Sequence, residues 1–403
     1  MKRSCGILMH ISSLPSPYGI GTFGKEAERF ADWLKSAGQK YWQVLPIGPT
    51  GYADSPYQPF SSFAGNPLLI DLDDLVESGW LAKSSVDDAD YGADPTFVDF
   101  DKVSRSKMAL LREAFAGFTD DVGYTSFVID EQDWLEDYAL FTALKSKFGS
   151  KPYTQWDEDI KMRKPEALKR WREELSEEIK FVKFVQYVFW RQWDRFHRYC
   201  NKNGIQLIGD IPIYVSPDCA DVWAQPELFE LNEKHEPKRV AGVPPDYFSK
   251  TGQLWGNPLY NWQEMHKTGY KWWLQRIGKA QESFDMLRID HFRAFDTYYA
   301  IPAGELTAER GVWEKGPGME LFNAVKNDLG DVNIIAEDLG DIFESVKKLL
   351  RDTGFPGMRV LQFGFNAEHT DNDHLPHNYP ANCCAYTGTH DNSTIMEWLR
   401  EAD

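Results

Sequence analysis

The sequence predicts an α/β fold, specifically a (β/α)8 TIM barrel enlarged by helical and loop insertions. Short apolar, β-prone runs recur along the chain, and segments with helical periodicity separate them. Strands that alternate with helices in this way favour a parallel sheet covered on its faces. The length of 403 residues, without an obvious break or linker, favours a barrel over an open sheet.

Seven mainly aliphatic runs are expected to be barrel strands. They cover residues 6–13, 41–48, 205–213, 285–292, 333–340, 357–365 and 383–390. A further run at 66–72 is expected to be a strand of an insertion. Apolar residues at helical spacing predict helices at 25–38, 318–330 and 342–354. An eighth strand and the C-terminal helices of such a barrel are not found, so the barrel is expected to be C-terminally incomplete.

The chain is expected to form one unit, a catalytic (β/α) barrel over residues 1–403 that carries two insertions. Segment 73–200 reads as mostly helical, because long amphipathic stretches fill it. Segment 214–284 reads as a loop-rich insertion that covers the active-site cleft.

Charge and composition indicate which kinds of binding partner the protein is expected to have. Acidic residues outnumber basic ones 62 to 44, for a net charge of -18, which repels nucleic acids and anionic membranes. No run approaches the roughly 18 apolar residues of a membrane helix, and the first residues make a poor signal peptide. Five scattered cysteines without CxxC spacing favour reduced thiols and a cytoplasmic location. We therefore expect a neutral small-molecule or polymer substrate, no nucleic acid and no membrane; no oligomeric state is assigned.

Charged side chains gather at the carboxyl ends of four predicted strands. These residues are Asp210, Asp290 with His291, Glu337 with Asp338, and His390 with Asp391. One such carboxylate could simply cap a helix, but the repetition on four strands is harder to explain by capping. In parallel barrels the active site lies at this end of the strands. We expect these side chains to converge on one pocket.

Two carboxylates in one pocket are what glycosidic bond cleavage requires, one as nucleophile or base and the other as acid. Arg288 lies on the same strand face as Asp290, two residues earlier, and is expected to keep Asp290 ionised and aimed. A metal-dependent hydrolase is the rival hypothesis, because His and Asp at strand ends also bind metals. The first strand offers only His10, without an HxH pair, and no HExxH motif occurs. We therefore expect no metal.

The strand-end motifs resemble those of a known family. "LRIDHFRAF", "IIAEDLG" and "YTGTHDN" are similar to the catalytic-strand motifs of the α-amylase clan of retaining glycosidases. "SPYQPFSSFAGNP", "GVPPDYFSKTGQLWGNPLYNW" and "HLPHNYP" resemble more narrowly the 4-α-glucanotransferases (amylomaltases, disproportionating enzymes) of glycoside hydrolase family 77. The resemblance runs from about residue 6 to the last residue.

The resemblance implies roles for ten residues. Asp290 would be the nucleophile, Glu337 the general acid and base, and Asp391 a stabiliser of the transition state. Seven further residues would bind substrate or support the site: Tyr57, Asp210, Asp246, Trp255, Arg288, His291 and His390. Tyr57 would stack on the transferred sugar, and Asp246 and Trp255 would lie on a loop over the cleft.

The implied activity is retaining transfer of α-1,4-glucan segments through a covalent glycosyl-aspartate. Donors would be malto-oligosaccharides or glucans derived from starch or glycogen, and the acceptor would be the 4-hydroxyl of glucose or a glucan. No cofactor is expected, because no GxGxxG after a strand and no P-loop occurs. The alternatives are a hydrolytic α-amylase or α-glucosidase of the same clan and a non-enzymatic starch-binding protein. The last would require lost catalytic carboxylates, and all three are present.

Overall fold

A curled parallel sheet organises the molecule. The computed structural model describes residues 3–51, 54–245, 249–340, 342–365 and 370–401. Its larger sheet has the order β1-β2-β3-β6-β9-β10-β11, and every neighbouring pair of strands is parallel. These strands are β1 (Gly6–Leu8), β2 (Tyr41–Gln43), β3 (Gln206–Pro212), β6 (Met286–Asp290), β9 (Ile334–Ala336), β10 (Gly357–Val360) and β11 (Cys383–Tyr386). The predicted parallel α/β barrel fold is confirmed, with seven strands in this sheet within the described residues.

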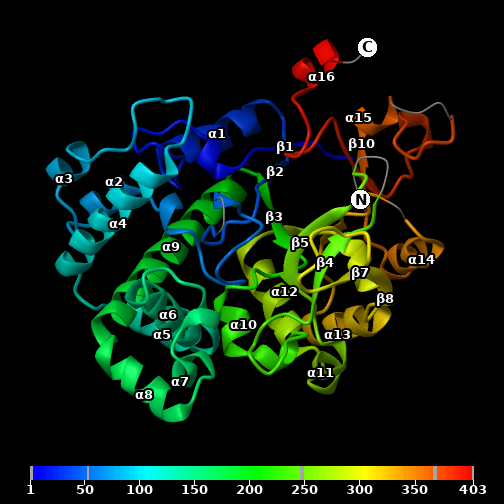
Figure 1. The fold of residues 1–403 in the computed structure, drawn as a ribbon. Coiled ribbons are helices and arrows are strands. Elements are labelled where there is room, and N and C mark those ends of the chain that lie inside the picture. The colour runs from blue at the N-terminus through cyan, green and yellow to red at the C-terminus, as the bar shows by residue number, and fades with distance from the viewer. Residues whose placement is uncertain (1–2, 52–53, 246–248, 341, 366–369, 402–403) are drawn as a thin grey trace.

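Helices cover the outside of the sheet, as crossover connections require (Figure 1). The helices of the first half are α1 (Lys25–Ser36), α2 (Leu72–Glu77), α3 (Lys83–Asp87), α4 (Phe100–Gly117), α5 (Val122–Asp130), α6 (Gln132–Lys147), α7 (Glu158–Lys161), α8 (Pro165–Glu174) and α9 (Ser176–Lys202). Those of the second half are α10 (Ala220–Ala224), α11 (Trp262–Lys267), α12 (Lys271–Ser283), α13 (Met319–Leu329), α14 (Glu344–Thr353), α15 (Leu361–Gly364) and α16 (Ile395–Glu401). Around the barrel α9 contacts α1 and α12, and α13 contacts α12 and α14. No helix of the described residues is both long and apolar enough to cross a membrane.

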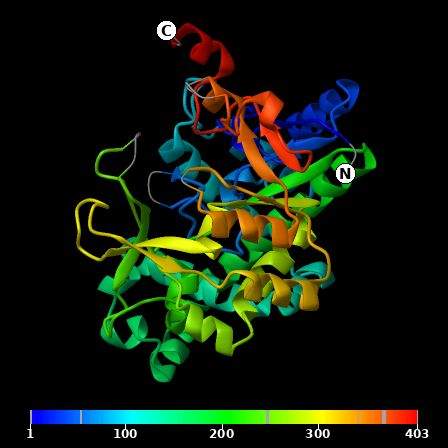
Figure 2. The same cartoon turned by 90° about the vertical axis from the view of Figure 1, so that its right-hand side faces the viewer.

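A second sheet, absent from the prediction, stands at one side of the barrel (Figure 2). It is antiparallel, with the order β5-β4-β7-β8. Its strands are β4 (Arg239–Val243), β5 (Gln253–Pro258), β7 (Thr297–Pro302) and β8 (Val312–Lys315). Two of them come from segment 214–284, which therefore contains regular structure as well as loops. Two come from the connection between β6 and β9.

The strand predicted at 66–72 is wrong. Residues Pro67–Leu69 form a 3-10 turn, and α2 begins at Leu72. The Asn66 side chain accepts a hydrogen bond from the backbone N–H of Leu68, and Asp71 caps α2 by accepting from Asp74. Such caps favour helical turns over an extended chain, and they outweigh the apolar run that suggested a strand.

The barrel strands are shorter than predicted, because the chain leaves the extended conformation before the end of each run. β1 ends at Leu8, before a 3-10 turn at Ile11–Ser13, and β10 ends at Val360, before α15. Inside the sheet, an apolar cluster of Ile208, Met286, Ile335 and Met358 fills the barrel. Side chains two positions further along a strand share its face, so Asp210, Arg288 and Glu337 follow Ile208, Met286 and Ile335 on the inner face.

Candidate active site

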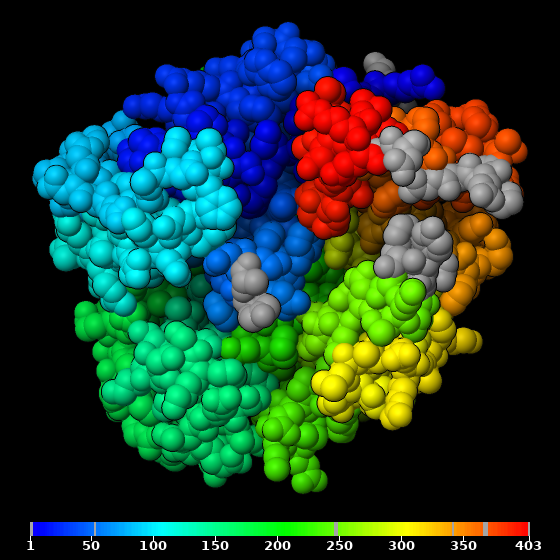
Figure 3. Space-filling view, turned by 45° about the horizontal axis from the view of Figure 1, so that its top comes forward, coloured from blue at the N-terminus to red at the C-terminus, as the bar shows by residue number. Residues whose placement is uncertain are grey.

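A cavity of about 380 Å³ lies at the carboxyl ends of the parallel strands. It is lined by Tyr57, Val243, Pro244, Gln253, Trp255, Arg288, Asp290, His291, Arg293, Trp313, Glu337, Leu339, Gly340, Thr389, His390 and Asp391. Figure 3 shows the hollowed face on which blue, yellow-green and red segments meet, and these segments supply some of the lining residues. Of the predicted strand-end residues, Asp290, His291, Glu337, His390 and Asp391 line this cavity, whereas Asp210 and Asp338 do not.

Arg288 joins two carboxylates at the floor of this cavity. Its Nη1 lies 2.8 and 2.7 Å from the two carboxylate oxygens of Asp210, and its Nη2 lies 2.9 Å from Oδ1 of Asp290. The β3–β6 register places Asp210 beside Arg288, and Asp290 follows two residues later on the same face. A planar guanidinium with a fixed fork of donors suits this bridge. The expected aiming of Asp290 by Arg288 matches this geometry.

The pKa of Asp290 is raised even though Arg288 contacts its carboxylate. Burial raises the pKa of this carboxyl to about 6, the attraction of Arg288 opposes that rise, and the negative charge of Asp210 adds to it. Arg288 therefore limits the rise without cancelling it, because its charge is shared with Asp210. The sequence showed the Arg288–Asp290 pair, but the burial of Asp290 depends on the folded barrel.

Glu337 follows β9, the strand beside β6, and its carboxylate is fixed by two backbone donors. The N–H of His291 lies 2.7 Å from Oε2, and the N–H of Leu339 lies 2.9 Å from Oε1. Burial, followed by repulsion from Asp290, raises the pKa of Glu337 to about 7. Two carboxyls that disfavour joint ionisation can divide the tasks of acid and nucleophile.

His291 has a left-handed backbone, with φ of 52°, which turns its N–H towards Glu337. Its ring meets the Trp255 indole edge to face, with centroids 4.8 Å apart. Burial and the neighbouring Arg293 lower the pKa of His291 to about 3. The imidazole is therefore neutral near pH 7 and can both donate and accept a hydrogen bond.

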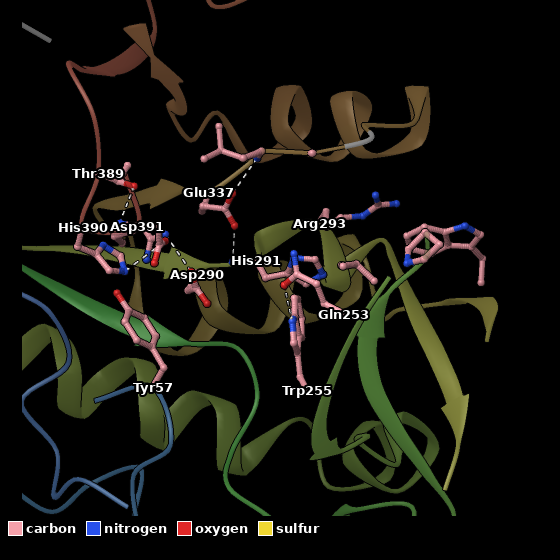
Figure 4. A pocket seen from close by; sticks show the side chains of 16 residues that line it. Tyr57, Gln253, Trp255, Asp290, His291, Arg293, Glu337, Thr389, His390 and Asp391 are labelled. Carbon is pink, nitrogen blue, oxygen red and sulfur yellow. Dashed lines mark hydrogen bonds and ion pairs between the residues drawn. The ribbon is translucent and has the colours of Figure 1, made fainter. Parts of the chain in front are cut away.

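Tyr57, His390 and Asp391 form the opposite end of the cavity (Figure 4). The Tyr57 hydroxyl donates to Oδ2 of Asp210 over 2.7 Å, and its ring stacks on His390 with centroids 5.2 Å apart. Nε2 of His390 lies 3.4 Å from Oδ2 of Asp391, whose side chain is 76% exposed. An exposed carboxylate and two stacked rings suit the hydroxyls and the apolar face of a sugar.

Asp210, one of the predicted substrate-binding residues, does not line the cavity. The Asp210 side chain is fully buried and is held by Arg288 and Tyr57, so its position suits support of other residues and not contact with a sugar. Asp246 lies outside the described residues. Trp255, on β5, does line the cavity, and its indole N–H donates to Gln253.

Several residues that line the cavity were not among the predicted site residues. Arg293 belongs to the same quoted motif as Asp290, so closer attention to that motif could have found it. Thr389, next to His390, could have been found in the same way. Gln253 also belongs to a quoted motif, two residues before Trp255. Trp313 stands on β8 of the antiparallel sheet, and no sequence signal placed that strand beside the barrel.

The described residues contain no group of three or more His, Cys, Asp and Glu side chains placed to hold a metal ion. His10, the only histidine of the first strand run, is half-buried, and its Nδ1 accepts a hydrogen bond from the N–H of Leu45. Burial, with a smaller effect of His390, lowers the pKa of His10 to about 4.

Comparison with known proteins gives one family. The family model described as 4-alpha-glucanotransferase matches residues 9–403. The 4-alpha-glucanotransferase of Clostridium butyricum is 50% identical over 394 residues, which cover 97% of this chain and 81% of that protein. That of Streptococcus pneumoniae serotype 4 is 49% identical over 403 residues, which cover 99% of this chain and 80% of that protein.

A solved structure agrees with these matches. Amylomaltase from Streptococcus agalactiae in complex with acarbose matches with a TM-score of 0.97 and 44% identity, over 100% of this chain and 82% of that one. Amylomaltase from Corynebacterium glutamicum, at 20% identity and a TM-score of 0.81, shares the fold. This chain belongs to the 4-alpha-glucanotransferase family, glycoside hydrolase family 77.

Proposed function

We propose that this protein transfers α-1,4-glucan segments from a malto-oligosaccharide donor to the 4-hydroxyl of a glucose or glucan acceptor, with retention of configuration. The observation that carries the proposal is the placement of Asp290 and Glu337 at the ends of adjacent strands, in one cavity with Asp391. Donors include glucans derived from starch or glycogen, no cofactor takes part, and the reaction takes place in the cytoplasm.

In the first step a carboxylate oxygen of Asp290 attacks the anomeric carbon, and the bond from that carbon to the glycosidic oxygen breaks. Glu337 gives its proton to the departing oxygen, which leaves as the 4-hydroxyl of the released glucan. Asp391 and His390 hold hydroxyls of the sugar that carries positive charge in the transition state. The product of this step is a glycosyl ester of Asp290.

In the second step the 4-hydroxyl of an acceptor attacks the same carbon and gives its proton to Glu337. The ester bond breaks, and Asp290 regains its charge. Two successive inversions restore the α configuration. Trp255 and the stacked Tyr57 and His390 favour a bound sugar over water, because positioning and exclusion of solvent both assist the sugar hydroxyl.

Incubation with maltotriose tests the proposal. A transferase converts two molecules of maltotriose into glucose and maltopentaose, so the number of reducing ends stays constant. A hydrolase of the same clan produces maltose and glucose, and the number of reducing ends rises. A steady rise in reducing ends without products longer than maltotriose would show hydrolysis and would contradict the proposal.

The pH dependence of kcat/KM is expected to be bell-shaped, with its maximum between about pH 6 and about pH 7. As the pH falls through about 6, Asp290 takes up a proton and stops acting as a nucleophile. As the pH rises through about 7, Glu337 loses the proton that the leaving oxygen needs. Because the two carboxyls interact, the two apparent pKa values of the pH profile describe the Asp290–Glu337 pair and not either residue alone. Initial rates of maltotriose disproportionation from pH 4 to 9 measure both limbs, and an activity that rises steadily to pH 9 would contradict this assignment.

Arg288→Lys is expected to lower kcat by about 100-fold, because one ammonium group cannot contact the three oxygens that Arg288 holds. With less support for the Asp290 charge, the acid limb of the pH profile should move to higher pH. Arg29→Lys is the matched control, since Arg29 lies on α1 with its side chain 73% exposed. An Arg288→Lys enzyme with unchanged kcat and unchanged acid limb would exclude the positioning role.

A further inference from the structure

The antiparallel sheet places a tryptophan at the far end of the catalytic cavity. Trp313, on β8, is half-buried and lines the cavity together with Arg293. The guanidinium carbon of Arg293 lies 4.1 Å from the centroid of the Trp313 ring and 4.8 Å from that of Phe343. Cation–π contact of this kind holds an aromatic ring in place. Trp313 is therefore a fixed aromatic surface that borders the cavity.

The order of residues along the cavity shows which part of the substrate would reach Trp313. In Figure 4, Tyr57, His390 and Asp391 lie at one end and Arg293 at the other, with Asp290 and Glu337 between them. Glu337 protonates the oxygen that leaves, so the leaving glucan, and later the acceptor, occupies the side of Glu337 away from His390. His291, Gln253 and Trp255 lie on that side, between Glu337 and Arg293.

The first acceptor sugar must present its 4-hydroxyl near Asp290 and Glu337, so it lies beside His291 and Trp255. Trp313, next to Arg293, can then touch only a later unit of the acceptor. Aromatic rings stack on the apolar faces of sugar rings, and each such contact adds buried apolar area.

We propose that Trp313, held by Arg293, binds the second or third glucose unit of the acceptor and so makes the enzyme prefer malto-oligosaccharide acceptors to glucose. The inference rests on the proposed transfer function and adds a determinant of acceptor length to it. Trp313 also packs against the cluster of Val240, Tyr299, Ile301 and Ala308, so the test must separate binding from support of the sheet.

The test uses an α-maltosyl fluoride donor whose non-reducing 4-hydroxyl is methylated, so that the donor cannot also act as acceptor. Fluoride leaves without occupying the acceptor side, and glucose, maltose and maltotriose are compared as acceptors. For Trp313→Ala, the KM for maltotriose should rise about tenfold, a change that matches the upper end of aromatic contact energies. The KM for glucose and the fluoride release without acceptor should stay within twofold of the parent protein.

Two further variants make the result specific. Trp313→Phe keeps an aromatic ring and much of the packing, and should restore most of the maltotriose affinity. Trp33→Ala removes a tryptophan that is 53% exposed on α1 and does not line the cavity, and should change none of the values. An equal rise in KM for glucose and maltotriose in Trp313→Ala, or no change for either, would overturn the proposal. A parent protein that forms no transfer product at all would instead refute the proposed function.

Discussion

Asp290→Asn is expected to abolish disproportionation of maltotriose, with a loss on the order of 10⁴- to 10⁶-fold, comparable to the loss of other covalent nucleophiles. Asparagine has nearly the same shape, and its amide oxygen can still accept from Nη2 of Arg288. The buried Arg288 also keeps both contacts with Asp210. The fold should therefore survive, and a thermal melt within a few degrees of the parent protein would show that it has.

A second substitution makes the role of Asp290 testable by stereochemistry. Asp290→Ala leaves space for a small anion on the face of the sugar that the carboxylate attacks. With α-maltosyl fluoride and azide, this variant should form the β-glycosyl azide by a single inversion. Substantial residual transfer activity in Asp290→Asn, or an α-azide from Asp290→Ala, would contradict the assignment of Asp290 as nucleophile.

Glu337→Gln is expected to lower the rate of maltotriose disproportionation by about 10²- to 10⁴-fold, the usual range for loss of a general acid. Fluoride is a good leaving group and needs no proton, so the first step with α-maltosyl fluoride should remain fast. The second step lacks its base, because the glutamine amide cannot take a proton from the acceptor. A maltosyl-enzyme should therefore accumulate, and intact-mass and peptide mass measurements should place the added maltosyl group on Asp290.

Glu337→Gln also disturbs the hydrogen bonds that hold Glu337, so a control must separate this effect from the lost acid and base. The two carboxylate oxygens of Glu337 accept hydrogen bonds from the backbone N–H groups of His291 and Leu339. A glutamine has only one side-chain oxygen to accept them, so Glu337→Gln leaves one of these buried donors without a partner. Glu337→Ala with azide separates this cost from the lost chemistry, because azide needs no base and should release the α-glycosyl azide. Absence of any covalent adduct in Glu337→Gln, together with normal maltotriose activity, would remove Glu337 from the mechanism.

The catalytic strands were predictable because each one is marked by a short motif of neighbouring residues. In a parallel sheet the residues that end each strand meet at one edge, so Asp290, Glu337 and His390 could be brought together from three short motifs. The helices at 25–38, 318–330 and 342–354 were predictable for the same reason, since their periodicity lies within each segment. The structure places them at Lys25–Ser36, Met319–Leu329 and Glu344–Thr353.

The antiparallel sheet was not predictable, because its pairing joins residues far apart in the chain. Gly242 of β4 pairs with Tyr299 of β7, and Tyr299 pairs in turn with Trp313 of β8. Short strands such as Val312–Lys315 carry little pattern of their own. The pKa of Asp290 escaped prediction for a related reason, since burial depends on every element that surrounds a side chain and not on its neighbours in sequence.

The antiparallel sheet forms one wall of the cleft, and its strands come from two separate connections of the chain. Sequence changes in one connection therefore have to remain compatible with the other. β4 and β5 belong to the connection after β3, whereas β7 and β8 belong to the connection after β6, and the β4–β7 pairing joins the two. An exchange of only one of these connections between relatives would set a foreign strand against an old register and misplace both Trp255 and Trp313. In a chimaera of two related enzymes, residues 239–258 and 297–315 should therefore come from the same parent.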